Sequence, residues 1–201
     1  MVLTGALGAC AVGGPPGAAS EPQAASEPGG ATGASSVPVA VSASPPEKSS
    51  TRGVLSGTRQ VTMVRVGSFE SGLSLTEAGG LAEVDDDSGR QLFVPTPQGG
   101  RRFLIKAYSR TSTGALCWRV HNPGDTRPLV VRAAACAAED PRQQFEIVAA
   151  STGDPQSYLI SNSGAFLRHS AQSGLILEEL GDGSPTSSFR FIDNGPAPAG
   201  R

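Results

Sequence analysis

The amino-acid sequence predicts an all-β domain of three similar units around an axis, preceded by a long disordered tether. A Phe in a short apolar strand closes each unit. These residues are Phe93, Phe145 and Phe189. Each unit also carries a Gly followed three residues later by Leu or Cys, and the anchors Gly72, Gly114 and Gly164 lie 42 and 50 residues apart. Self-similarity at such a period indicates one supersecondary unit used three times, because a single unit cannot bury its apolar face alone.

β-Strand is the expected structure in every unit. Apolar and polar residues alternate with period two at residues 73–75 and 189–191, and short apolar runs elsewhere are bounded by turn signals such as the Asn-Pro-Gly-Asp of residues 122–125. No window of about a dozen residues carries a helical stripe. The clearest strands cover residues 62–66, 73–75, 91–94, 102–106, 129–131, 143–147, 157–161, 175–177 and 187–191. About four short strands per unit are expected.

Composition divides the 201-residue chain into a tether and a domain. Residues 11–58 are mostly Ala, Gly, Pro, Ser and Thr, with Ala-Ala-Ser-Glu-Pro at residues 18–22 and again at 24–28. Such a segment cannot bury enough apolar surface to offset its ordering entropy. We therefore expect a disordered linker there, one domain over residues 59–195 and a disordered tail over 196–201. A flexible linker of that length reaches roughly 35–40 Å, enough to hold a domain clear of a bilayer.

The N-terminus carries a possible lipidation signal. Residues 7–10, Leu-Gly-Ala-Cys, resemble a bacterial lipobox, in which small residues precede a Cys that is lipidated and becomes the mature N-terminus. Residues 1–10 would then be a truncated lipoprotein signal, because the apolar stretch before Cys10 is short and has no basic region. An ordinary secretory cleavage site and a cytoplasmic chain with a chance Cys are the alternatives. The linker favours an extracellular or cell-surface, lipid-anchored protein, attached to the membrane only through Cys10, since no segment reaches the ~18 apolar residues of a membrane span.

The middle unit has motifs in a distinctive order. Residues 114–118 read Gly-Ala-Leu-Cys-Trp, an apolar run at 129–131 leads to Cys136, and residues 143–145 read Gln-Gln-Phe. This order resembles the ricin-type β-trefoil lectin repeat, in which a Gly-x-x-Cys strand is followed by a second Cys and a Gln-x-Trp strand closes the unit. The closing Trp is Phe in all three units here. The resemblance covers roughly residues 60–193 and implies a β-trefoil with pseudo-threefold repeats that binds carbohydrate.

The same resemblance implies a disulfide between Cys117 and Cys136. Disulfides persist in exported proteins, so this pairing agrees with the predicted location. The bond would close a loop of about 20 residues.

The third unit has a likeness of its own. Residues 164–169, Gly-Ala-Phe-Leu-Arg-His, and the closing residues 188–191 are similar to the arabinose-binding trefoil repeats appended to arabinofuranosidases. In that family the His after Leu-Arg lines a sugar pocket, which implies this role for His169. The Asp expected three residues before the closing Phe is Thr186 here. A further likeness is to the trefoil accessory subunits of cytolethal distending toxins, which are exported and in some cases lipid-anchored.

The candidate carbohydrate-binding residues occupy positions that the resemblance makes equivalent. In ricin-type repeats the residue two after the Gly-x-x-Cys cysteine is often an Asp that binds sugar hydroxyls, and the equivalents here are Glu77, Arg119 and His169, none of which is Asp. A solvated strand face is the alternative for each of them. Trp118 either packs in the core or offers an aromatic platform to a sugar. We expect the third unit to hold the main site, where His169 would share sugar hydroxyls with Arg168, Glu178 and Asp182.

Several function classes are disfavoured. The net charge of −2 gives no electrostatic footprint for nucleic acid. Neither His121 nor His169 lies in a metal-ligand spacing, and no nucleophile elbow or phosphate loop is present. We therefore expect no catalysis, metal or cofactor, and predict an exported, surface-tethered lectin-like module whose partners are cell-surface or polysaccharide glycans. The alternative is a protein-interaction trefoil, such as a toxin accessory or cell-binding subunit or an inhibitor.

Overall fold

The computed structural model describes residues 51–68, 71–85, 91–108, 114–151, 154 and 156–199. Their regular secondary structure is almost entirely β-strand, as predicted. The strands are β1 (Arg59–Arg65), β2 (Gly72–Leu75), β3 (Leu81–Val84), β4 (Phe93–Gly99), β5 (Arg102–Tyr108), β6 (Ala115–His121), β7 (Val130–Ala135), β8 (Gln144–Ala149), β9 (Ser157–Asn162), β10 (Ala165–Ser170), β11 (Gly174–Glu179) and β12 (Phe189–Pro196). A short helix α1 (Thr51–Val54) precedes them, and the 3-10 helix η1 (Pro141–Gln143) precedes β8. Within the described ranges, no helix is long and apolar enough to cross a membrane.

Six of the strands close into a barrel. β1 pairs with β4, β4 with β5, β5 with β8, β8 with β9, β9 with β12, and β12 with β1 again, all antiparallel. The ring therefore takes the first and fourth strand of each unit in turn. Closure removes the unpaired edges that an open sheet would expose.

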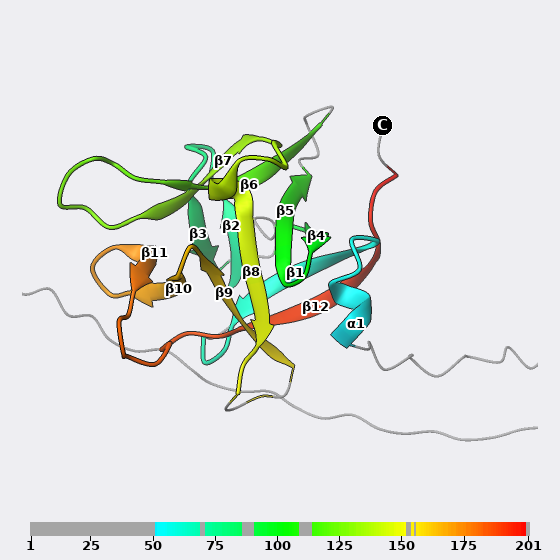
Figure 1. Ribbon diagram of the computed structural model, residues 1–201. Coiled ribbons are helices and arrows are strands. Elements are labelled where there is room, and N and C mark those ends of the chain that lie inside the picture. Colours follow the sequence, from blue (N-terminus) through cyan, green and yellow to red (C-terminus); the bar gives the residue numbers. More distant parts are fainter. Residues whose placement is uncertain are drawn as a thin grey trace, which may run out of the picture. The chain divides into compact units, whose positions relative to one another are not determined.

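The other six strands form one antiparallel hairpin per unit, β2–β3, β6–β7 and β10–β11, which together we call the cap. The hairpins contact one another in turn: Gly80 bridges Arg132, Leu129 bridges Leu177, and β11 lies against β3. A six-stranded barrel with three hairpins in pseudo-threefold arrangement is a β-trefoil, which confirms the predicted architecture. The long β6–β7 loop and the β10–β11 hairpin below it can be followed in Figure 1.

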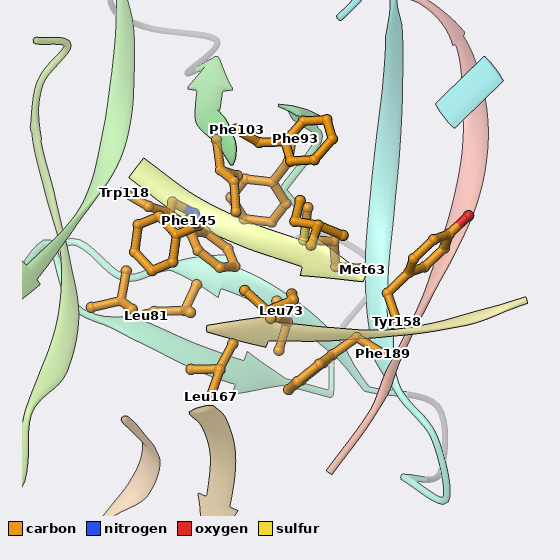
Figure 2. Packing of buried hydrophobic residues seen from close by; sticks show 14 of the residues in the cluster. Met63, Leu73, Leu81, Phe93, Phe103, Trp118, Phe145, Tyr158, Leu167 and Phe189 are labelled. Carbon is orange, nitrogen blue, oxygen red and sulfur yellow. The ribbon is translucent and has the colours of Figure 1, made fainter. Parts of the chain in front are cut away.

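The closing Phe residues occupy equivalent places in the barrel, as the repeat predicted. Phe93 pairs with Val61, Phe145 with Phe103, and Phe189 with Tyr158, so each joins the fourth strand of a unit to its first strand. All three are 0% exposed. Figure 2 shows all three side chains among the other buried hydrophobic residues of the core. One unit alone could not bury its closing Phe, because the core that surrounds the ring is built from all three units.

A polar side chain two residues before each closing Phe ties the barrel to the cap. Gln91 Oε1 accepts the N–H of Leu75 at 2.9 Å, and Ser187 Oγ accepts that of His169 at 3.2 Å. Gln143, 1% exposed, makes two such bonds. Its Oε1 accepts the N–H of Ala137 at 2.9 Å and its Nε2 donates to the carbonyl of Ala135 at 2.8 Å. The Gln of the repeat motif therefore satisfies backbone groups of the hairpin in its own unit.

Trp118 lies in the core and is 0% exposed. Its ring stands edge-on between Phe93 and Phe145, with ring centroids 5.1 and 5.8 Å away (Figure 2). Such edge-to-face contacts add to the free energy of burying the rings. Trp118 therefore packs in the core and does not offer an aromatic surface to a sugar. The alternation of side chains along β6 turns it toward the barrel interior.

The predicted disulfide is confirmed. Cys117 and Cys136 are joined, with their Cα atoms 4.9 Å apart. Cys117 pairs with Ala134 across the hairpin, so the bond fastens the start of β6 to the residue after β7. The β6–β7 hairpin is thus crosslinked at the end opposite its long loop.

The domain boundaries differ from the prediction at both ends. Val54 of α1 is only 3% exposed and belongs to the core, so the ordered domain begins before residue 59. Pro196 ends β12, and the N–H of Ala197 donates to the carbonyl of Thr58 at 2.7 Å, so the chain is still paired where the tail was expected. The sequence did not predict these contacts, because the apolar residues at both ends are isolated beside Gly or Ser and form no periodic pattern. Residues 1–50, with Cys10 and most of the predicted tether, lie outside the described residues.

All three Gly anchors lie where the second strand of a unit begins, since Gly72 is the first residue of β2 and Gly114 and Gly164 immediately precede β6 and β10. Their backbone conformations differ. Gly72 is buried within β2, whereas Gly164 has φ +86° and follows Ser163 at φ +50° in a two-residue turn between β9 and β10. Positive φ at both central residues is the type I′ geometry that matches hairpin twist. The Gly anchors therefore mark the start of each second strand without sharing one backbone conformation, and the closing Phe residues are the equivalent core positions.

Candidate functional site

His169 in β10 is the central residue of the sugar site that the sequence predicts in the third unit. Its side chain is 37% exposed, and its Nε2 lies 3.9 Å from Oε2 of Glu83 in β3. Glu83 is already held by Arg65, whose Nη2 donates to Oε2 at 3.1 Å. The His169 ring is therefore turned toward the ion pair between Glu83 of the neighbouring hairpin and Arg65 of β1.

The other third-unit candidates do not join His169. Arg168 is its neighbour on the strand, so its side chain points to the opposite face, where it pairs with Glu178. The hydrogen bond from Arg168 lowers the pKa of Glu178 below its ordinary value. Asp182 is exposed in the segment between β11 and β12. The structure therefore does not bring the four residues together.

The two remaining candidates lie in different surroundings. Glu77 is exposed in the turn between β2 and β3. Arg119 lies on β6, half-buried, and its Nε donates to Oδ2 of Asp140 at 2.9 Å. Of the residues proposed from sequence, Arg119 is the one that lines a hollow in the described surface.

That hollow lies where the three hairpins of the cap meet. It has two connected parts, with volumes of about 250 and about 420 Å³, which share Ala78, His121 and Arg132. The larger part receives residues from every hairpin: Thr76 and Gly80 from the first, Val131 and Arg132 from the second, Ser173 and Leu175 from the third. We call the two parts together the cap hollow. Only assembly of all three units creates it.

The walls of the cap hollow divide into an apolar floor and a polar rim. Leu81, Val131 and Leu175 form the floor and are 7%, 1% and 4% exposed. The rim carries hydroxyl, imidazole and guanidinium groups. These belong to Thr76, Ser173, His121, Arg119, Arg127 and Arg132. Among its described lining residues there is no Asp or Glu, and no Phe, Tyr or Trp.

Strand register places two of the cations face to face. Arg119 and Arg132 are directly opposite each other in the β6–β7 pair, and His121 follows Arg119 by two residues on the same face. Asp140 engages the first of these arginines and also Arg142, whose Nε lies 3.0 Å from Oδ1. Hydrogen bonds, chiefly from Arg142, lower the pKa of Asp140 to about 2. Asp140 therefore stays ionised and keeps Arg119 engaged.

Sequence reasoning singled out Arg119 but missed His121 and Arg132 as site residues. The period-two alternation of β6 could have placed His121 beside Arg119. No local signal gives the register that sets Arg132 opposite, because the two strands are joined by a long loop. Across the described ranges there is also no group of three or more His, Cys, Asp and Glu residues that could hold a metal ion.

Comparisons with known proteins bear on the fold alone. No family model and no curated protein matches this chain, so the ricin-type resemblance has no matching family model. A type II water-soluble chlorophyll-binding protein and the water-soluble chlorophyll protein of Brassica oleracea var. Botrytis with chlorophyll b each have a TM-score of 0.50. Both share 13% identity over 68% of this chain and 92% of theirs. A Kunitz-type cysteine protease inhibitor from potato has a TM-score of 0.47, with 13% identity over 68% of this chain and 90% of its own.

Proposed function

We propose that this domain is a non-catalytic binding module and that its ligand is a carbohydrate held in the cap hollow. The observation that carries the proposal is the hollow itself, a concave site that receives residues from all three units. Its larger part, about 420 Å³, falls within the roughly 300–1,000 Å³ of small-molecule sites. A rim of hydrogen-bonding groups above an aliphatic floor matches a molecule with hydroxyl edges and C–H faces.

The composition of the hollow also predicts how strong such binding is. A sugar in the cap hollow would find no aromatic ring to stack on among the described lining residues. Its contacts would be of two kinds: hydrogen bonds that replace those to water, and aliphatic contacts with Leu81 and Leu175. We expect dissociation constants on the order of 0.1–1 mM, or about −4 to −5.5 kcal/mol. Many copies tethered to one surface would raise the effective affinity through avidity.

Surface tethering is part of the same proposal. The lipobox-like sequence at Cys10 and the Pro/Ser-rich linker after it support an exported, lipid-anchored protein. The Cys117–Cys136 disulfide agrees with an oxidising compartment. The chlorophyll-binding neighbours share this architecture at 13% identity, so the ligand class is argued from the site and not from the fold.

A glycan array probed with the full chain tests the proposal. We expect a subset of glycans to be retained, His121→Ala to lose them, and His169→Ala to keep them. If His169→Ala loses binding and His121→Ala keeps it, the sugar site belongs to the third unit as the sequence suggested. If no glycan is retained at any density, the carbohydrate proposal is wrong and the protein-interaction trefoil takes its place.

A further inference from the structure

The cap hollow carries a positively charged side chain that a neutral sugar would leave without a negative partner. Directly opposite residues on antiparallel strands have Cβ atoms roughly 5 Å apart, and like charges there are destabilising. Arg119 and Arg132 are such a pair. Asp140 engages Arg119, yet the described residues offer no carboxylate to Arg132.

The contacts of Arg132 leave its charge available. Its one described side-chain hydrogen bond runs from Nη2 to the carbonyl of Ala78 at 3.0 Å. That bond orients the guanidinium at the edge shared by both parts of the hollow, because Ala78 lines both parts as well. The side chain is therefore positioned but not neutralised.

His121 is the second basic side chain of the hollow that no carboxylate engages among the described residues. Its ring is half-buried and lines both parts of the hollow. No side-chain hydrogen bond of His121 occurs within the described part of the chain. A half-buried imidazole that forms no hydrogen bond leaves binding capacity unused. It lies beside the two arginines, where an acceptor with negative charge would satisfy it.

Two nearby carboxylates are already engaged by other arginines. Asp140 is engaged by Arg119 and Arg142, and Asp125 by Arg127, whose Nε lies 2.8 Å from its Oδ2. Neither aspartate lines the hollow. The site therefore combines a fixed guanidinium, a free imidazole and an aliphatic floor.

We infer that the cap hollow recognises an acidic sugar, with Arg132 and His121 as the direct partners of its carboxylate or sulfate group. The sugar part of this inference rests on the proposed function, whereas the anion part rests on the charges alone. A guanidinium presents paired N–H donors that match two oxygens of a carboxylate or sulfate. The pyranose ring would then lie over Leu81 and Leu175.

The test measures binding of the full chain by calorimetry to neutral, carboxylated and sulfated oligosaccharides of one backbone and length, and to inorganic sulfate. We expect the acidic forms to bind at least about tenfold more tightly than the neutral form, which is about 1.4 kcal/mol. Raising the salt from about 0.05 to about 0.5 M should weaken the acidic forms only, because screening acts on the charge contact.

Variants assign the effect to the hollow. Arg132→Gln should lower affinity for the acidic forms about tenfold more than it lowers affinity for the neutral form, and His121→Gln provides a second loss variant if the first folds poorly. Asp140→Asn should tighten the acidic forms, because Arg119 is then released to face the ligand. Arg102→Gln is the matched control, since it removes one exposed positive charge from β5 outside the hollow.

The outcomes separate the two proposals. If acidic and neutral forms bind equally and Arg132→Gln behaves as Arg102→Gln does, the anion inference is overturned while carbohydrate binding stands. If inorganic sulfate binds with the expected Arg132 dependence and no oligosaccharide does, the anion site stands and the carbohydrate function fails.

Discussion

Arg119 and Asp140 form an ion pair of 2.9 Å that joins β6 of the cap to the residue preceding the 3-10 helix η1. Asp140 also caps that helix, because its Oδ1 accepts the N–H of Arg142 at 3.0 Å. The Asp140 carboxylate therefore fixes the start of η1 and also forms an ion pair with Arg119, one of the two arginines that face each other across β6 and β7. The other arginine, Arg132, has no carboxylate partner among the described residues, and its Nη2 donates to the carbonyl of Ala78.

Acid sensitivity is the first prediction. The pKa of Asp140 is lowered from 3.8 to about 2, chiefly by its hydrogen bond from the Arg142 side chain. A group whose pKa falls on folding stabilises the fold above its unfolded pKa and loses that effect as the pH falls through the folded value. Thermal melts of the full chain between pH 5 and pH 2, as a rough window, should show a loss that Asp140→Asn lacks. If the two proteins lose stability in parallel across this window, Asp140 contributes none of it.

The closing Phe residues should matter similarly in all three units. Phe93→Ala, Phe145→Ala and Phe189→Ala each remove a ring that is 0% exposed, and each should lower the free energy of unfolding by about 3–5 kcal/mol. Urea denaturation provides the measurement. Ile192→Ala, at a position 46% exposed, is the control and should cost far less. A near-neutral Phe variant would contradict the equivalence of the three positions.

The polar residue before each closing Phe should matter unequally. Gln143→Ala leaves two backbone groups of the hairpin without partners at a position that is 1% exposed. We expect a loss of about 2–4 kcal/mol, because each buried unsatisfied group costs roughly 1–3 kcal/mol. Ser187→Ala removes one bond at 3.2 Å near the surface and should cost about 1 kcal/mol or less. Equal losses for the two variants, measured by urea denaturation, would contradict this ranking.

Reduction of the disulfide should destabilise the domain. The Cys117–Cys136 bond closes a loop with a sequence separation of 19 residues. The chain-entropy model gives a loop of that size a stabilisation of about 3 kcal/mol. The double variant Cys117→Ala/Cys136→Ala should show this loss in urea, and adding reductant should change it no further. Two alkylatable thiols at these positions in protein from an oxidising compartment would contradict the native bond.

Lipidation at Cys10 is a separate prediction from the sequence. We expect metabolic labelling with a fatty-acid analogue to mark the wild-type chain expressed in bacteria from a verified start codon. Cys10→Ala should lose the label and release the protein from the membrane fraction. An unlabelled wild-type chain would refute lipidation and leave the domain's binding site unaffected.

The sequence alone determined the features that local pattern and pairwise spacing encode. Period-two alternation and turn residues gave the all-β class, and the buried Phe93, Phe145 and Phe189 gave the threefold repeat, because a core position demands a large apolar residue in every unit. The motif order around Cys117 and Cys136 implied the disulfide. The same reasoning did not reveal that Gly164 alone of the three Gly anchors has a positive φ, because spacing does not encode backbone conformation.

Only the tertiary structure decided where the candidate site lies. His169 and Arg168 are adjacent in sequence, yet neighbours on a strand face opposite sides, so they cannot share one ligand pocket. Arg119 and Arg132 are joined by a long loop, and register alone sets them face to face. The cap hollow needs residues from three hairpins that are distant in sequence, so its shape and charge follow from how the units pack and from no single segment.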